Sequence, residues 1–166
     1  AEEANAALVF TNYEDEKLFG LAANSEYHIN SAALTSNSNG EIPIQDLWYG
    51  EKLAIIRAGS TPEVNSNPKE LPVPQKPDAP NTVTSENVTV KGLDDGKLLG
   101  VTTAMEYRKD SESNWIPCQG AVVEGLPAGT YYVRFSAVTD SGKEAFSSNA
   151  VTIKIESGDT PTYTVN

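Results

Sequence analysis

The stretch Leu18-Phe19-Gly20-Leu21 recurs 80 residues later (98 − 18) as Leu98-Leu99-Gly100-Val101. Further matches keep this spacing to within one residue: Glu26-Tyr27 with Glu106-Tyr107, Gly40 with Gly120, Leu47 with Leu126, Gly50 with Gly129, and Val73 with Ile153. A register this regular predicts two tandem copies of one small domain. Tandem copies are typical of proteins selected for reach, avidity or surface display.

The composition fits two small cores. The 166 residues are 39% hydrophobic, and each copy of about 75 to 85 residues is near the lower limit for a domain that folds alone. The net charge of −11 argues against a nucleic-acid partner, because phosphate neutralisation supplies most of that affinity. Apolar runs such as Leu53–Ile56 are far shorter than the roughly 18 residues of a membrane helix, so no membrane insertion is expected.

Short apolar runs separated by turn formers dominate the chain. Runs such as Lys52–Arg57 and Val151–Ile155 indicate strands, and Asn39-Gly40 and Ala128-Gly129 indicate turns. This pattern predicts an all-β protein of two tandem small antiparallel β-sandwiches. The sole helix candidate is a turn near Gln45–Tyr49.

A proline-rich segment separates the two copies. Leu71–Pro80 has four prolines in ten residues, which favours a stiff polyproline II spacer. Because Pro72 and Pro74 flank Val73, a final strand of the first copy here must be an edge strand. The expected organisation is a first sandwich over 1–75, a linker over 76–81, a second sandwich over 82–157 and an exit linker over 158–166. We expect the chain to be a fragment of a longer polypeptide, and we expect this fragment to be monomeric.

The stretch Gly125–Ala137, GLPAGTYYVRFSA, resembles the signature before the sixth strand of fibronectin type III and related immunoglobulin-like modules. In that signature a tyrosine hydroxyl closes a corner onto upstream backbone. Here Tyr131 and Tyr132 are adjacent, which leaves open which of them is the corner residue.

Other motifs are similar to repeats of secreted, multi-modular bacterial surface proteins. In the second copy these are Thr103–Arg108, Trp115 with Cys118, and Ser147–Ile153; in the first copy, Asn12–Leu18 and Ile55–Ala58 resemble that repeat's usual partner. The resemblance implies a secreted or cell-surface protein of a Gram-positive-type bacterium. It also implies that the partners are neighbouring domains of the same polypeptide, among them glycoside hydrolases or adhesins.

Few residues are candidates for catalysis. His28 alternates with Tyr27 and Ile29 in an expected strand and should face solvent. Cys118 has no histidine in its copy, so a small buried side chain is expected rather than a nucleophile. Carboxylate clusters at Glu14–Glu16 and Asp94-Asp95 are expected to be solvated turns. We therefore expect no enzyme, no catalytic or metal-binding residues and no cofactor.

Aromatic residues are the candidates for binding. Trp48-Tyr49, with Tyr27, could stack on pyranose rings if the pair is exposed in its turn, whereas Trp115 is expected in the second core. The sequence thus predicts a non-catalytic spacer or display module, with a carbohydrate-binding, adhesive module as the alternative. The further partners expected are a polysaccharide or a surface protein. Burial of the tryptophans favours the spacer, and an exposed coplanar pair favours binding.

Overall fold

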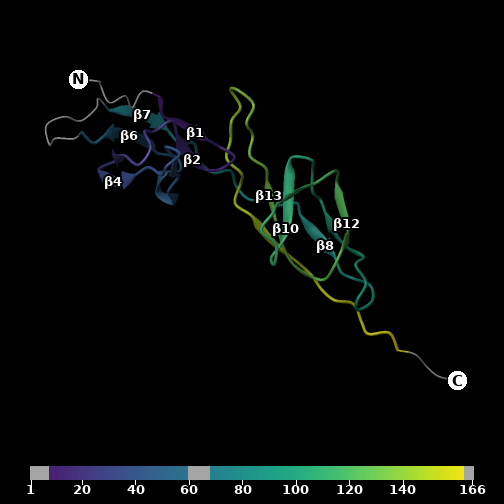
Figure 1. Cartoon of the computed structure of the whole chain (residues 1–166). Coiled ribbons are helices and arrows are strands. Elements are labelled where there is room, and N and C mark those ends of the chain that lie inside the picture. The colour runs from purple at the N-terminus through teal and green to yellow at the C-terminus, as the bar shows by residue number, and fades with distance from the viewer. Residues whose placement is uncertain (1–7, 60–67, 163–166) are drawn as a thin grey trace. The chain divides into compact units, whose positions relative to one another are not determined.

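The computed structural model describes residues 8–59 and 68–162, and β-strands make up almost all the regular structure of this part (Figure 1). A short 3₁₀ helix at Asp46–Trp48 lies where the sequence predicts a helical turn. No helix in the described part of the chain is long and apolar enough to cross a membrane. The chain divides into two compact units, which we describe one at a time.

Unit 1 runs to Lys76 and also includes Ala137–Phe146. Its strands are β1 (Phe10–Asn12), β2 (Lys17–Phe19), β3 (Glu26–Ile29), β4 (Ala32–Thr35), β5 (Ile42–Pro43), β6 (Lys52–Arg57) and β7 (Lys69–Pro72). They form two antiparallel sheets, ordered β1-β2-β5 and β4-β3-β6-β7. β7 is an edge strand, as its prolines predict.

The core of unit 1 lies between its two sheets. Leu18 and Ile42 from the smaller sheet join residues of β3 and β6 from the larger one in a single buried cluster. Along β3 and β6 the buried side chains alternate with more exposed ones, as in any strand with one face on a core. Phe146, from the second segment of unit 1, is fully buried in the same cluster.

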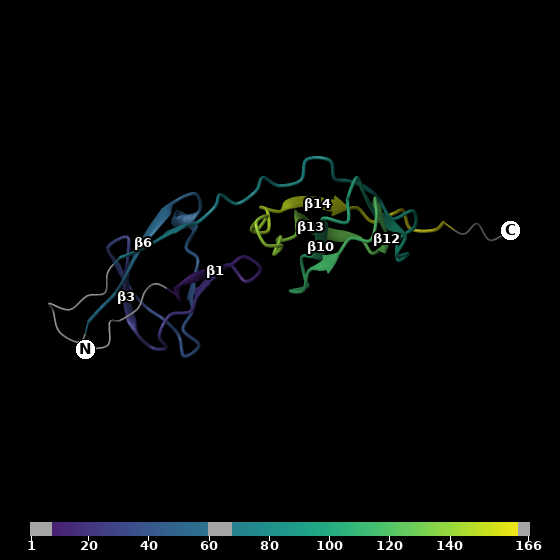
Figure 2. The ribbon, with the colours of Figure 1, turned by 90° about the horizontal axis from the view of Figure 1, so that it is seen from above.

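Unit 2 contains the remaining strands. They are β8 (Thr84–Glu86), β9 (Gly96–Leu99), β10 (Met105–Lys109), β11 (Ile116–Pro117), β12 (Val122–Leu126), β13 (Gly129–Phe135) and β14 (Val151–Ile155). The sheets are ordered β12-β9-β8 and β11-β10-β13-β14, with β10, β13 and β14 side by side in Figure 2. Adding seven to each strand number of unit 1 reproduces these two orders. The two units therefore share one seven-strand arrangement.

The core of unit 2 is built by the same rule. Leu98 of β9, Met105 of β10 and Val133 of β13 are buried in one cluster, together with Cys118. The expectation of a small, buried cysteine is confirmed, since Cys118 is 3% exposed. Burial, with the nearby Glu106 carboxylate, raises the pKa of its thiol.

Gly20 and Gly100 are matched in the repeat and have the same backbone conformation and the same kind of close contact. Each follows the second strand of its unit with a positive φ, +85° and +72°. A Cβ would lie 2.2 Å from the Leu8 carbonyl oxygen at Gly20 and 2.2 Å from the Thr82 carbonyl oxygen at Gly100. Only glycine fits both the backbone conformation and the close approach.

Other matched pairs do not occupy equivalent environments. Leu47 is 87% exposed, whereas Leu126 is 6% exposed. Tyr27 is fully buried, whereas Tyr107 is only partly buried. The reason is a shift in strand pairing, because Tyr27 lies opposite Arg57 near the end of β6, while Tyr107 lies opposite Val133 in the middle of β13.

The unit boundaries differ from the expected ones. Residues 137–146 belong to unit 1, although the sequence boundaries assign them to the second sandwich. Asp159, expected in the exit linker, pairs with Val90, and its carbonyl accepts a hydrogen bond from Lys91. The apolar stretch Val88–Val90 has only that one bridge, and the Thr89 amide donates to the Asp95 carboxylate. Residues 73–80 have no regular secondary structure.

Candidate functional site

Trp48, the centre of the predicted aromatic platform, is a core residue. Its side chain is 7% exposed and packs in the cluster of unit 1. The 3₁₀ turn explains this, since the Trp48 amide donates to the Gln45 carbonyl and leaves Leu47 as the exposed residue of the turn. Trp48 therefore does not provide the exposed ring that the carbohydrate-binding alternative requires.

Tyr27 is also inside unit 1. It is 1% exposed, and its hydroxyl accepts a hydrogen bond of 2.9 Å from the Ala22 amide. A buried tyrosine needs such a partner for its polar end. The ring is therefore not exposed for stacking on a sugar, as the carbohydrate-binding alternative would require.

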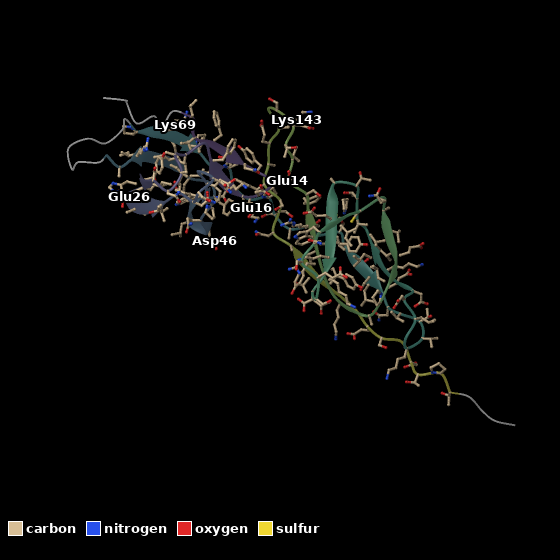
Figure 3. The ribbon with its side chains drawn as sticks, viewed as in Figure 1. Glu14, Glu16, Glu26, Asp46, Lys69 and Lys143 are labelled. Atoms are coloured by element: carbon tan, nitrogen blue, oxygen red, sulfur yellow. The ribbon has the colours of Figure 1, made fainter. Side chains whose placement is uncertain are left out.

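Tyr49 is half-buried, and its contacts are internal to unit 1. Its hydroxyl donates to Glu16 at 3.0 Å, and its ring meets Phe146 edge-on at 5.1 Å between centroids. The Lys76 ammonium lies 5.3 Å from the ring centroid and 2.7 Å from the Glu16 carboxylate, whose position Figure 3 marks. Burial, and the hydrogen bond to Glu16, raise the pKa of Tyr49. These contacts hold Tyr49 as a structural residue.

The adjacent tyrosines of β13 have different roles. Tyr131 is 2% exposed, and its hydroxyl donates to the Pro127 carbonyl at 2.8 Å. Tyr132 points to the other face, where its hydroxyl donates to Asp110 at 3.0 Å. Tyr131 is therefore the residue whose hydroxyl closes back onto upstream backbone. Its burial raises its pKa to about 12.

Trp115 is half-buried on the outer face of β10 and β13 instead of in the core. The guanidinium carbon of Arg134 lies 4.0 Å from the centroid of its ring, and that of Arg108 lies 5.2 Å from it. Arg108 also stands 4.7 Å from the Tyr132 ring, and Arg134 donates to Glu106 at 2.7 Å.

We call this set the Trp115 clamp: Glu106, Arg108, Trp115, Tyr132 and Arg134. Two cross-strand pairs, Glu106–Arg134 and Arg108–Tyr132, form its base. Each cation–π contact at such a site contributes about 0.5 to 1 kcal/mol. The clamp therefore fixes the segment before β11 onto the sheet. The sequence did not indicate it, although Arg108 and Arg134 occupy the outward positions of their strands.

The titratable residues considered for catalysis are divided between the units, with His28 and Glu14–Glu16 in unit 1 and Asp94-Asp95 and Cys118 in unit 2. The His28 side chain is 41% exposed, as its alternation predicts, and its Nε2 lies 3.4 Å from Glu26. Asp95 accepts hydrogen bonds from the amide and hydroxyl of Thr89, and these lower its pKa. Within 8–59 and 68–162, no group of three His, Cys, Asp or Glu side chains could hold a metal ion.

One exposed aromatic pair was missed by the sequence reasoning. Phe10 and Phe19 lie opposite each other on β1 and β2, with ring centroids 5.7 Å apart. They are 50% and 40% exposed. The signal was available, because each phenylalanine is one position away from a buried aliphatic residue, Val9 or Leu18.

Comparison with protein-family models gives no match, and comparison with curated proteins gives none either.

Proposed function

We propose that the chain is a non-catalytic spacer or display module of a larger exported bacterial protein, built from two fibronectin type III-like or related immunoglobulin-like sandwiches. Two features support the family. Each unit has a three-stranded and a four-stranded sheet in the same order. Tyr131 also bonds back to the Pro127 carbonyl, as the corner tyrosine of such modules does with upstream backbone.

The observation that carries the functional proposal is the use made of the aromatic side chains. Trp48 and Tyr27 fill a core, Tyr131 closes a corner, and Trp115 contacts two arginines. These four aromatic side chains are thus engaged in the fold of their own units. A module whose large side chains serve packing is suited to hold attached domains apart and in solution.

The remaining parts of the proposal follow from it. A spacer acts through neighbouring domains of its own polypeptide, and a net charge of −11 keeps such a module soluble. A secreted or cell-surface location, and association with polysaccharide-acting or adhesive proteins, belong to the same proposal.

Single-molecule energy transfer between dyes at the two ends of the chain tests the spacer role. Two folded units should give a narrower distribution of end-to-end distances than an unfolded chain of the same length. The matched control is a Gly/Ser-rich chain of equal length, which behaves as a broad random coil. A distribution for the native chain as broad as that of the control would contradict the proposal.

A second control keeps the length and nearly all of the sequence but weakens the fold of both units. Leu53→Ala with Val133→Ala truncates one fully buried side chain in each unit. In mild denaturant this variant should lose the narrow distribution while the native chain keeps it. If both chains respond alike, folding of the units does not set the distance, and the spacer role fails.

A further inference from the structure

The outer face of the β1-β2-β5 sheet in unit 1 carries a paired aromatic surface next to a polar network. Phe10 lies opposite Phe19, and one step along the same face Asn12 lies opposite Lys17. The inward residues of these strands, Thr11 and Leu18, alternate with them.

The polar network is continuous. The Lys17 ammonium contacts Glu41 at 2.8 Å and Asp15 at 3.0 Å. Asn12 donates to Asp15 at 3.1 Å, and Asn37 donates to Glu41 at 3.1 Å. Each carboxylate keeps unused acceptor positions, since its two oxygens accept about four hydrogen bonds.

The fold does not require the aromatic pair. In unit 2 the strands β8 and β9 pair in the same way, and Thr84 lies opposite Leu99 where unit 1 has Phe10 opposite Phe19. Lys97 takes the place of Lys17 and contacts Glu86 at 3.1 Å. Unit 2 thus has an ion pair at this lysine but no phenylalanine pair beside it. The Phe10–Phe19 pair is therefore specific to unit 1.

We propose that this face, Phe10, Phe19 and the network of Asn12, Asp15, Lys17 and Glu41, binds a neutral oligosaccharide. The rings would stack on the C–H faces of sugars, and the network would exchange hydrogen bonds with their hydroxyls. This site is independent of the spacer role proposed above.

The size and charge of the surface favour a saccharide over other occupants. The half-exposed rings, with Leu8 at 59% exposure beside them, offer roughly 300 Å² of apolar surface. A stable protein interface needs about 800 Å² from each partner. The chain's charge of −11 disfavours an anionic glycan.

Affinity electrophoresis of the full chain tests the site. The gels contain xyloglucan, galactomannan, hydroxyethylcellulose or dextran, with heparin as the anionic control. The test variant is Phe10→Thr with Phe19→Leu, which installs the residues of unit 2. We expect retardation by at least one neutral polysaccharide, no retardation by heparin, and an affinity about tenfold lower in the variant.

Two measurements separate binding from folding and from self-association. The cross-strand aromatic pair itself contributes only about 0.2 to 1 kcal/mol, so the variant should keep a native-like unfolding transition. Thr84→Val is a matched control on unit 2 and should bind as the native chain does. No retardation by any neutral polysaccharide, retardation unchanged in the double variant, or a concentration-dependent dimer abolished by it would each overturn the proposal.

Discussion

Units 1 and 2 share a strand order but place their aromatic residues differently. In unit 1 the single tryptophan, Trp48, is in the core, and a phenylalanine pair stands outside on the smaller sheet. In unit 2 the tryptophan, Trp115, lies outside on the larger sheet, in contact with two arginines. The common order depends on buried aliphatic residues such as Leu18 and Leu98. The aromatic residues are therefore where the two copies acquired different surfaces.

Phe146 should give the largest effect, and it tests which unit its segment belongs to. The ring is fully buried between Tyr13, at 4.9 Å, and Tyr49, at 5.1 Å. Phe146→Ala should destabilise unit 1 by about 3 to 5 kcal/mol through the cavity it leaves. Urea unfolding followed by Trp48 fluorescence in a Trp115→Phe background should show this loss.

The control for Phe146 is the exposed Val138 of the same segment, 38% exposed, where alanine should cost little. The Trp115 transition, recorded in a Trp48→Phe background, should move less than the Trp48 transition. A larger shift for Trp115 would assign the segment to unit 2 and break the division described here.

The glycine pair should give the next largest effect and tests whether the copies are equivalent. Gly20→Ala and Gly100→Ala each force a side chain into the left-handed region and onto a carbonyl oxygen. Each should cost its own unit roughly 2 to 4 kcal/mol. Gly142→Ala is the control, because its φ of +81° is similar but nothing lies within 4 Å, so only about 1 to 2 kcal/mol is expected. Unequal costs for Gly20 and Gly100 would weaken the equivalence of the two units.

Tyr131→Phe tests a feature described only in unit 2. The change removes the hydroxyl that bonds the Pro127 carbonyl, and it should destabilise unit 2 by about 1 kcal/mol. Tyr132→Phe removes an exposed hydrogen bond to Asp110 and should be close to neutral. The readout is the urea midpoint of Trp115 fluorescence. Equal effects of the two substitutions would remove the distinction between the adjacent tyrosines.

The smallest effect concerns the ion pair between Lys17 and Glu41 in unit 1. The hydrogen bond from Lys17, with that from Asn37, lowers the pKa of Glu41 below its unfolded value of about 4.3. The ionised Glu41 therefore stabilises unit 1 above about pH 4.3, and this contribution is lost as the pH falls through the lower pKa of the folded state. Glu41→Gln should flatten the acid limb of stability, measured by urea midpoints between about pH 5 and pH 2.5. An unchanged acid limb would contradict this assignment.

The sequence predicted much of the fold because alternation and spacing are local signals. Leu18 and Leu98 were matched and are both fully buried, and Pro72 correctly indicated an edge strand. The site was less predictable, since exposure depends on how a turn is directed. Leu47 and Trp48 are adjacent in the turn, and a shift of one position would exchange which of them enters the core of unit 1. Alternation along each strand indicates that Phe10 and Phe19 are exposed, but their pairing, like that of the Trp115 clamp, depends on strand register, which spacing within one strand does not reveal.

The central claim is that Trp48 is a core residue of unit 1 and Trp115 a surface residue of unit 2. The most direct test is acrylamide quenching of the two single-tryptophan chains. In Trp115→Phe the remaining Trp48 should be shielded from the quencher until urea unfolds unit 1. In Trp48→Phe the remaining Trp115 should be quenched in the folded state. Comparable quenching of both tryptophans in the native chains would contradict the account and restore Trp48 as a surface residue open to a ligand.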